Sequence, residues 1–159
     1  MKSMFENDLD FLSNMYLCKI KYNGKVFKSS EHLYQYLKID DNGLWWKEKI
    51  IESEHGKIAK KLTKNKKCPL KTFKNDFQKN LFLIRNMIKC IDLKFNQNYD
   101  LHKRLLTTND ANLVEWNYWG DTFYGKDIRT ENGKNYLGRI LKIKKYKLIK
   151  DNLKDEITS

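Results

Sequence analysis

Apolar residues recur at intervals of three and four in two long stretches of the chain, which is the spacing of one face of an α-helix. The first stretch is residues 76–95 and the second is residues 134–154. The apolar positions are Leu81, Ile84, Ile88 and Ile91 in the first stretch and Leu137, Ile140, Leu141 and Leu148 in the second. Each set predicts one apolar stripe along an amphipathic helix, with lysines on the outside of the second helix.

Two further segments have a helical pattern. Residues 45–62 begin with Trp45 and Trp46 and continue to Leu62, and we expect one helical stretch over this range. We also expect a short helix near residues 99–106. No internal repeat and no linker separates these segments.

The pattern changes at residues 18–29, which predict a β-hairpin. Apolar residues alternate with polar ones on both sides of Asn23-Gly24. Asn-Gly is the strongest short hairpin signal, because both central residues of a type I′ turn need a positive φ. Ser29-Ser30 then offers an N-cap for a helix over residues 31–39, because a serine hydroxyl can bind an orphan amide at a helix start. We expect Asp40-Asp41-Asn42-Gly43 to end this helix.

The composition agrees with a mainly helical, globular domain. The 159 residues suffice for one domain with a core and are too few for two comfortable ones. Hydrophobic residues make up 40% of the chain and aromatic residues 13%, which argues against disorder. One proline and seven glycines give few turn signals, so short helix connections are favoured over a β fold with many turns. We expect a mainly α single domain with a small N-terminal β-hairpin.

The same composition argues against several classes of protein. No run approaches the roughly 18 apolar residues that a membrane span needs, and acids interrupt the first ten positions, unlike a secretory signal. The cysteines share no C-x-x-C spacing, and no histidine stands at a metal-ligand spacing from a cysteine. These residues are Cys18, Cys68, Cys90, His32, His55 and His102. We expect a cytoplasmic protein without a disulfide framework, a metal or a cofactor.

The formal net charge of +12 is carried mainly by lysine. Lysine-rich runs occupy residues 57–67 and residues 139–150. A positive field attracts polyanions, including nucleic acids and phosphorylated metabolites. However, the chain is rich in Lys, Asn and Ile, a bias that an AT-rich genome produces by itself. The charge therefore leaves direct contact with nucleic acid open.

The helix after the hairpin carries a candidate polar site. At 3.6 residues per turn, Glu31, Gln35 and Lys38 lie along one face, with Tyr34 beside them. This places a carboxylate, an amide and an ammonium group in line, although the same stripe is also compatible with an ordinary solvated helix face. Leu33, Tyr36 and Leu37 lie on another face and are expected to enter the core. His32, next to Glu31, is expected to be a capping or packing histidine rather than a base.

Two other segments could contact a ligand. Asn14 interrupts the short apolar stretch 11–16, where its amide either forms a turn or binds a ligand hydroxyl or phosphate. Residues 115–125, E-W-N-Y-W-G-D-T-F-Y-G, contain five aromatic rings whose regular spacing is broken by glycines. Rings on a loop suit stacking on a nucleobase, and Asp121 among them could serve as an acid. The alternative is that some rings seal the core under a surface turn that Asp121 caps.

The motifs resemble the NADAR (YbiA-like) family, whose first half has the pattern F-S-N-F, a G-K hairpin and S/T-x-E-H-Y-F-Q-A-x-K. The corresponding segments here are F-L-S-N-M-Y (11–16), Y-N-G-K-V-F (22–27) and S-S-E-H-L-Y-Q-Y-L-K (29–38). The second-half segments are L-K-F-N-Q-N (93–98), L-L-T-T-N-D-A-N-L-V-E (105–115), W-G-D-T-F-Y-G (119–125) and G-K-N-Y-L-G-R-I-L (133–141). The resemblance covers roughly residues 10–145, with the matching segments in the same order.

The resemblance implies a mainly α-helical, orthogonal YbiA-like bundle, here as one domain over residues 1–159 with a basic C-terminal helix at 134–154. It implies an N-glycosidase that acts on a ribose-linked substrate. Characterised members cleave ribosylamino-pyrimidine intermediates of riboflavin synthesis or remove ADP-ribose from guanine in DNA. The family is also linked to NAD and ADP-ribose metabolism on genomic grounds. The implied partner is thus a ribosylated or ADP-ribose-containing nucleotide, including ADP-ribosylated DNA, with no membrane involved.

The resemblance also implies roles for particular residues. The functional glutamate of the E-H motif corresponds to Glu31, and the acid of the W-G-D motif corresponds to Asp121. The substrate-binding positions are Asn14, His32, Gln35, Lys38, Trp119, Tyr124 and Asn135. Tyr124 and Tyr36 replace a tryptophan and a small residue of the family pattern, and only Phe73 and Phe77 lie near the place of another expected tryptophan. These departures concern the shape of the pocket and the choice of substrate.

The mechanism that we expect is hydrolysis of a C1′–N bond through an oxocarbenium-like ribosyl cation. One carboxylate would stabilise the cation or activate water, and a second would assist the leaving base or fix the ribose hydroxyls. We assign Glu31 to the first role and Asp121 to the second, with an exchange of the two left open. The competing hypotheses are a non-catalytic module that binds ADP-ribose, NAD or nucleic acid, and a purely structural basic protein.

Overall fold

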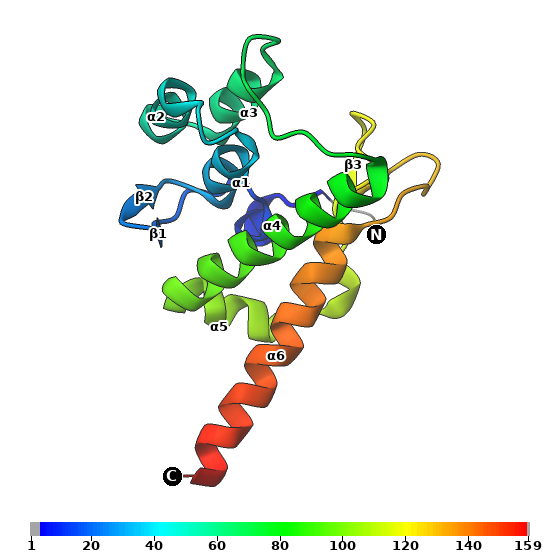
Figure 1. Ribbon diagram of the computed structural model, residues 1–159. Coiled ribbons are helices and arrows are strands. Elements are labelled where there is room, and N and C mark those ends of the chain that lie inside the picture. Colours follow the sequence, from blue (N-terminus) through cyan, green and yellow to red (C-terminus); the bar gives the residue numbers. More distant parts are fainter. Residues whose placement is uncertain (1–3, 159) are drawn as a thin grey trace. The chain divides into compact units, whose positions relative to one another are not determined.

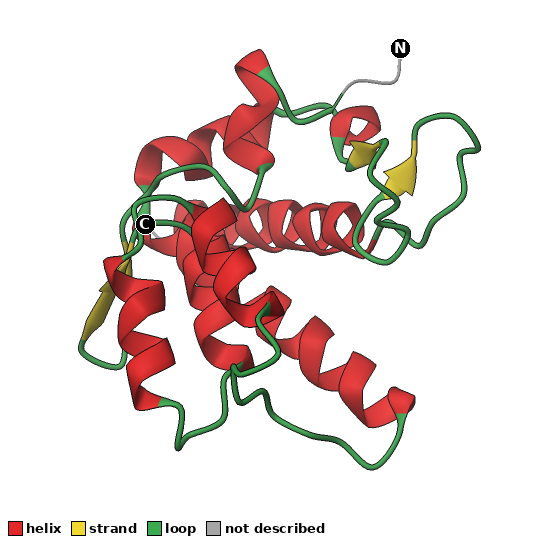
Figure 2. Ribbon diagram, turned by 90° about the horizontal axis from the view of Figure 1, so that it is seen from above, coloured by secondary structure: helices red, strands yellow, loops and turns green. Residues whose placement is uncertain are grey.

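The structure is a computed structural model that describes residues 4–158. Contacts divide the chain into two compact units: the α1–α4 unit, residues 14–98, and the α5–α6 unit, residues 1–13 and 99–159. The helices and strands are shown in Figures 1 and 2. In chain order they are η1 (Asn7–Leu12), β1 (Ile20–Tyr22), β2 (Lys25–Phe27), α1 (Ser30–Lys38), α2 (Leu44–Glu52), α3 (Gly56–Lys64), α4 (Asp76–Gln97), α5 (Tyr99–Thr107), η2 (Asp110–Asn112), β3 (Trp116–Asn117), β4 (Lys126–Asp127) and α6 (Tyr136–Thr158), where η marks a 3-10 helix.

The predicted hairpin is confirmed. β1 and β2 pair antiparallel with Ile20 opposite Phe27, and both side chains are buried. Asn23 and Gly24 form the turn with φ of 47° and 72°, the positive values that a type I′ turn needs. The mainly helical fold class with a small N-terminal hairpin is likewise confirmed, whereas the extent of one domain over the whole chain stays a prediction.

Helix α1 follows the hairpin and packs against α2, α3 and α4. Ser29 is its N-cap, as predicted, because the serine hydroxyl oxygen accepts a hydrogen bond from the backbone N–H of His32. The helix begins at Ser30 and ends at Lys38, so it stops before the Asp40–Gly43 turn that was expected to end it. Among the expected core residues Leu33 is fully buried, whereas Tyr36 and Leu37 are half-buried.

The expected helical stretch over residues 45–62 is interrupted, because α2 ends at Glu52 and α3 begins at Gly56. Ser53 turns to an extended backbone, and its carbonyl oxygen accepts a hydrogen bond from the side chain of Lys28. His55 then caps α3 by accepting a hydrogen bond from the N–H of Lys57. The residues that stabilise the break are Lys28, which is distant in sequence, and His55, which is adjacent. The helical period alone could therefore not predict where the helix is interrupted.

Gly56 lets the start of α3 approach α1 closely. A Cβ atom at this position would stand 2.7 Å from the sulfur of Met15 and 3.0 Å from the Cβ of Glu31. Real Cβ atoms essentially never come as close as the first distance, and the second distance is unusually tight, so a neighbouring group would have to shift. Glycine at position 56 therefore brings α3 against the part of α1 that carries Glu31.

Helix α4 is present as predicted, but its buried face differs from the expected stripe. Leu81 is 38% exposed and Ile88 is 43% exposed, so these two residues do not enter the core. The buried positions of the helix are Asn86, Met87, Cys90, Ile91, Lys94 and Phe95. The helix buries the side that contacts α1 and β1. Apolar residues also occur on its other side, so the sequence of the helix alone does not tell which side is buried.

In the α5–α6 unit, α5 packs against α6 and the predicted stripe of α6 is confirmed. Leu137, Ile140, Leu141 and Leu148 are all buried. The guanidinium group of Arg104 lies over the ring of Phe11 and donates a hydrogen bond to the carbonyl oxygen of Asp8, which holds η1 in this unit. Within residues 4–158, no helix combines the length and the apolar character that a membrane span requires.

Candidate functional site

The centre of the candidate site is the buried carboxylate of Glu31 in the first turn of α1. The side chain is only 6% exposed. Gln35 lies one turn later and donates a hydrogen bond from Nε2 to Oε1 of Glu31 over 2.6 Å. Gln35 itself is 2% exposed, so this pair is shielded from bulk water. The interpretation of this stripe as a solvated helix face is therefore wrong.

The side-chain oxygen of Gln35, Oε1, accepts two hydrogen bonds. One comes from the ammonium group of Lys38 over 3.0 Å, and the other comes from the hydroxyl group of Thr63 on α3 over 2.6 Å. Glu31, Gln35, Lys38 and Thr63 thus form one connected network, called the Glu31 cluster below. The predicted alignment of carboxylate, amide and ammonium group on one helix face is confirmed.

Asn14 binds the N-terminal end of α1. Its backbone carbonyl accepts a hydrogen bond from the N–H of Glu31 over 2.9 Å. Its side-chain oxygen accepts one from the hydroxyl of Ser30 over 3.0 Å, and its Nδ2 donates to the sulfur of Met87 over 3.3 Å. Asn14 is buried and positions Glu31, while its expected contact with substrate stays a prediction.

His32 is fully buried and uses both ring nitrogens within the protein. Nε2 lies 3.1 Å from the carbonyl oxygen of Ser53, and Nδ1 lies 2.7 Å from the hydroxyl of Ser29. Because a carbonyl can only accept, Nε2 carries the proton and Nδ1 of the neutral ring accepts from the serine. Burial lowers the pKa of His32, although the bond to Ser53 opposes this effect. The ring therefore holds α1 against the end of α2, which agrees with a packing histidine.

Lys38 is the cation of the Glu31 cluster. Burial lowers its pKa from the ordinary value, and the negative charge of Glu31 partly restores it. The neighbouring charges of Lys60 and Lys79 lower the pKa further. Lys38 therefore stands between a carboxylate and other ammonium groups, and its contact with substrate stays a prediction.

The charge of Glu31 also acts on α4. The thiol of Cys90 is buried, and its pKa is raised first by burial and then by the negative charge of Glu31. Cys90 therefore remains a neutral thiol at physiological pH. The buried side of α4 also holds Met87 and the lysine Lys94.

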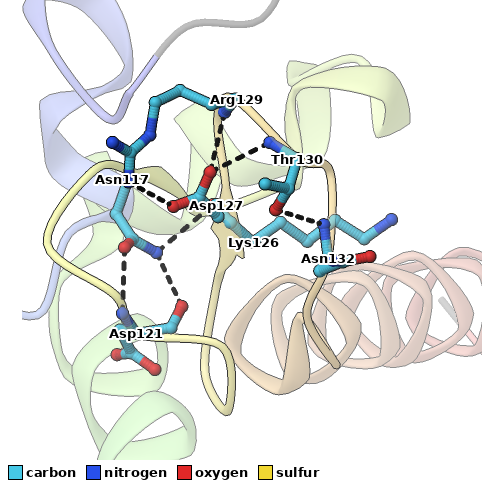
Figure 3. A network of polar contacts seen from close by, with 7 residues as sticks. All are labelled: Asn117, Asp121, Lys126, Asp127, Arg129, Thr130 and Asn132. Atoms are coloured by element: carbon cyan, nitrogen blue, oxygen red, sulfur yellow. Dashed lines mark hydrogen bonds and ion pairs between the residues drawn. The ribbon is translucent and has the colours of Figure 1, made fainter.

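Asp121 belongs to the α5–α6 unit, in the segment between β3 and β4. Its Oδ1 accepts hydrogen bonds from the backbone N–H groups of Phe123 and Tyr124 over 3.1 and 2.9 Å. Its own backbone N–H and C=O are bound by the side-chain amide of Asn117, as Figure 3 shows. This is the arrangement of a capped turn, the alternative that the sequence left open. Oδ2 makes no hydrogen bond to any residue in the range 4–158 that the structure describes.

The rings of this segment form pairs with each other. Trp119 is 57% exposed and meets Tyr118 edge to face, with 5.4 Å between ring centroids. Tyr124 is half-buried and meets Phe123 at 4.8 Å, also edge to face. An exposed indole on a loop can stack on a flat ligand, whereas Phe123 packs against Tyr136 at the start of α6. The binding roles of Trp119 and Tyr124 stay predictions.

Asn135 holds the backbone that precedes α6. Its side-chain oxygen accepts from the N–H of Glu115 over 3.0 Å, and its Nδ2 donates to the carbonyl of Leu113 over 3.1 Å. The residue is buried and has a φ of 51°, the left-handed region in which asparagine is tolerated. Both polar groups are thus engaged with the backbone, and a contact of Asn135 with substrate stays a prediction.

Three residues that sequence reasoning missed fix the geometry of these segments. Thr63 completes the Glu31 cluster, and Asn117 ties β3 to the Asp121 turn. Asp127 accepts hydrogen bonds from the backbone of Arg129 and Thr130 and pairs with the Arg129 guanidinium group, which lowers the pKa of Asp127 to about 2 (Figure 3). An aspartate whose side chain binds the backbone two residues on is typical of a turn and could have indicated Asp127, whereas no sequence signal singles out Thr63.

The structure thus brings Asn14, Glu31, Gln35 and Lys38 together in one unit. The residues Asp121, Trp119, Tyr124 and Asn135 lie in the other unit, and the pairing of Glu31 with Asp121 stays a prediction. In the described part of the chain, no group of three or more His, Cys, Asp and Glu side chains is placed to hold a metal ion.

The fold and the Glu31 cluster define a class, namely small, mainly helical proteins in which a buried carboxylate accepts a hydrogen bond from an amide of its own helix, and that amide accepts one from a hydroxyl of a neighbouring helix. Within this class the chain belongs to the NADAR family, because the model of the NADAR domain matches residues 3–148. The family resemblance of the sequence motifs is therefore confirmed.

Similar proteins support the same membership. N-glycosidase YbiA of Escherichia coli (strain K12) is 31% identical over 141 residues, which cover 85% of this chain and 79% of that protein. A riboflavin biosynthesis protein of Vibrio vulnificus (strain YJ016) is 35% identical over 133 residues, 82% of this chain and 33% of that protein. The chain therefore spans about a third of the length of the Vibrio protein. The NMR structure of E. coli YbiA superposes with a TM-score of 0.77 at 27% identity and covers 96% of this chain and 85% of that chain.

Proposed function

We propose that the protein is an N-glycosidase that hydrolyses the C1′–N bond of a ribosylated nucleotide, with Glu31 as the catalytic carboxylate. The observation that carries this proposal is the Glu31–Gln35 pair, in which a carboxylate 6% exposed receives a hydrogen bond of 2.6 Å. A folded chain buries an acid only where other interactions compensate for the lost hydration. The names of relatives in the family, N-glycosidases among them, support the reaction class.

Glu31 suits the first half of the reaction. Cleavage of a C1′–N bond develops positive charge on the ribose ring, and a carboxylate held in a low-dielectric site stabilises that charge or activates the attacking water. Gln35 fixes the carboxylate from one side, so the group needs little reorganisation when the charge develops. Lys38 supplies a positive charge in the same cluster, which suits a phosphate or a ribose hydroxyl of the substrate.

Asp121 is proposed for the second carboxylate role. Oδ1 holds the turn through two backbone N–H groups, and Oδ2 lies outside those bonds. Oδ2 could thus assist the departing base or bind ribose hydroxyls while the turn remains intact. Trp119 would stack on the base, because its indole is exposed on the same segment.

Two substrates fit this chemistry. An ADP-ribosylated nucleobase in DNA is favoured by the formal charge of +12, because a polyanion gains most from a positive field. A ribosylamino-pyrimidine phosphate of riboflavin synthesis is favoured by the name of the Vibrio relative. Both contain a ribose C1′–N bond, so one active site of this design could act on either. We place the DNA adduct first.

The test compares both substrates with wild-type protein and the variant Glu31→Gln. Glutamine keeps the size of the side chain and can still accept the Gln35 hydrogen bond, but it cannot act as a carboxylate. We expect wild-type protein to release the base from one substrate and Glu31→Gln to lose about 10²–10⁴ in rate. Glu48→Gln on the exposed side of α2 is the matched control and should keep full rate.

Each outcome has one meaning. Release of base from the ribosylamino-pyrimidine phosphate alone would exclude the DNA substrate. Tight binding of ADP-ribose without cleavage of either substrate would favour the non-catalytic binding module. Full turnover by folded Glu31→Gln would show that Glu31 is not the catalytic carboxylate.

A further inference from the structure

Thr63 is a residue of α3 that lies outside every NADAR motif of the sequence. Its side chain is buried. Its hydroxyl group lies 2.6 Å from Oε1 of Gln35, and the two residues are 28 positions apart. The contact therefore joins α3 to α1 at the residue that holds Glu31.

The groups around Gln35 decide which way its side-chain amide faces, and the Thr63 hydroxyl is one of them. An amide side chain can turn by 180° and exchange its oxygen with its NH₂ group, so its orientation is set by its neighbours. Here Thr63 and Lys38 both donate to the oxygen, and Glu31 accepts from the NH₂ group. The reversed amide would place its NH₂ group against the Lys38 ammonium and its oxygen against the Glu31 carboxylate, and both contacts would be repulsive.

Lys38 and Glu31 select the orientation of the amide by their charges, and Thr63 holds the amide oxygen in that orientation from α3. Lys38 is a long, flexible side chain, and its bond to Gln35 is the longer of the two at 3.0 Å. Thr63 is β-branched, so its hydroxyl has few rotamers and stays where the α3 backbone places it. The same hydroxyl lies 3.1 Å from the carbonyl oxygen of Lys60 in its own helix. The shorter distance to Gln35 indicates that the single hydroxyl proton is directed across the helix interface.

We infer that Thr63 is a positioning residue for the proposed glycosidase reaction: it fixes the Gln35 amide so that this amide donates to the Glu31 carboxylate. The inference rests on the proposed function for its effect on rate, but its structural part does not. Thr63 acts through Gln35 and is not a catalytic residue. α3 thus contributes to the reaction from a helix that carries none of the recognised site residues.

The first test compares the rates of Thr63→Val and Thr63→Ser with wild type. Valine has nearly the same shape without the hydroxyl, and serine restores the hydroxyl on a smaller side chain. We expect Thr63→Val to lower kcat by about tenfold to a hundredfold with KM little changed, because a residue that orients a catalytic group alters the reaction step more than binding. The acidic limb of the kcat–pH profile should move to higher pH, because a carboxylate with a less ordered donor is protonated more easily. Thr63→Ser should recover most of the rate and the profile.

A second measurement does not depend on activity. The side-chain NH₂ group of Gln35 gives its own ¹⁵N–¹H signals, and its hydrogens exchange slowly with water while they are bound to a buried carboxylate. We expect Thr63→Val to shift these signals and to accelerate exchange, and Thr63→Ser to restore both. Thr63→Ala provides the same comparison if the valine variant does not fold.

The results separate the two proposals. Unchanged Gln35 signals in folded Thr63→Val, or a serine variant as impaired as valine, would overturn the role of Thr63. Restored signals in serine and altered signals in valine would support it even if no glycosidase activity were found with any substrate. In that case the proposed function would fail while the amide-positioning role remained.

Discussion

The two carboxylates assigned to the reaction are held in different ways. Glu31 lies in a helix, is almost completely buried, and receives its hydrogen bond from the side chain of Gln35. Asp121 lies in a turn, is half-buried, and uses one oxygen to bind two backbone N–H groups. The Glu31 side chain is therefore held by another side chain, whereas the Asp121 side chain stabilises the turn in which it lies.

The supporting amides show the same contrast. Gln35 connects side chains to one another across α1 and α3, whereas Asn117 and Asn135 connect side chains to backbone. A network of side chains can be adjusted by single substitutions without unfolding the chain, because each helix still makes its own backbone hydrogen bonds. A network in which side chains bind the backbone of a loop cannot be changed in this way without loss of stability, because a loop lacks the regular backbone hydrogen bonds of a helix. Substitutions in the Glu31 cluster should therefore act mainly on activity, whereas substitutions of the amides that support the Asp121 turn should act mainly on stability.

The largest effect that distinguishes the two acids is expected from Asp121→Asn. Asparagine keeps an oxygen that can accept from the N–H groups of Phe123 and Tyr124, so the turn should persist. The carboxylate is lost, and we expect kcat to fall by about 10² if Asp121 acts as the second carboxylate. The measurement is kcat together with the thermal midpoint. An unchanged kcat at an unchanged midpoint would leave Asp121 as a turn residue alone.

The next effect concerns the approach of α3 to Glu31. Gly56→Ala would place a Cβ 2.7 Å from the Met15 sulfur and 3.0 Å from the Glu31 Cβ, so one of these groups must move. We expect a loss of about 1–3 kcal/mol in the free energy of unfolding, the usual cost of overpacking, and a lower kcat. Urea denaturation measures the first quantity. Lys57→Ala, at the next and exposed position, is the control and should change neither value.

A comparable loss of stability without a clash is expected from Asn117→Ala. The side-chain amide of Asn117 is fully buried and bonds to the backbone of Asp121 at both its N–H and its C=O. Removal leaves these backbone groups without their partner, which costs about 1–3 kcal/mol. Asn132→Ala removes an exposed amide from the same region and serves as the control. Equal stabilities of the two variants would contradict the role given to Asn117.

The smallest effects are expected in the dependence of stability on pH. The pKa of His32 is lowered from its ordinary value of 6.5 in the folded protein, so the unfolded chain binds more protons below that pH. The contribution of His32 to stability is therefore fully present above about pH 6.5 and is lost as the pH falls from there to the folded value. His32→Gln should remove this dependence, which hydrogen exchange of α1 amides can follow.

Asp127 in the α5–α6 unit should respond in a more acidic range. Its pKa falls from 3.8 to about 2 in the folded protein, first because the Arg129 side chain donates a hydrogen bond to the carboxylate. The stabilisation is fully present above about pH 4 and is lost as the pH falls towards 2. Hydrogen exchange in residues 116–132 should thus accelerate only in strong acid. Acceleration there at pH 5–6, together with α1, would contradict the separate behaviour of the two segments.

Several features could be predicted from the sequence because they depend on neighbours along the chain. Asn23-Gly24 predicted the hairpin, since the turn conformation is a property of those two residues. The spacing of Glu31, Gln35 and Lys38 predicted their common helix face, since the helical period fixes it. The stripe of α6 followed for the same reason.

Other features could not be predicted because their causes are distant. The break between α2 and α3 depends on Lys28 and His32, which bind the carbonyl oxygen of Ser53. The exposure of Leu81 depends on which side of α4 contacts α1. The place of Thr63 beside Gln35 depends on the approach of α3 that Gly56 permits.

Local patterns of the sequence are enough to predict the family, the helical class and the line of polar residues on α1. In the folded protein Glu31 and Gln35 of this line are buried, Thr63 completes the network, and one oxygen of Asp121 holds a turn. The difference arises because helix periods and turn propensities act over a few residues, whereas burial and the direction of a hydrogen bond depend on segments that meet only after the chain has folded.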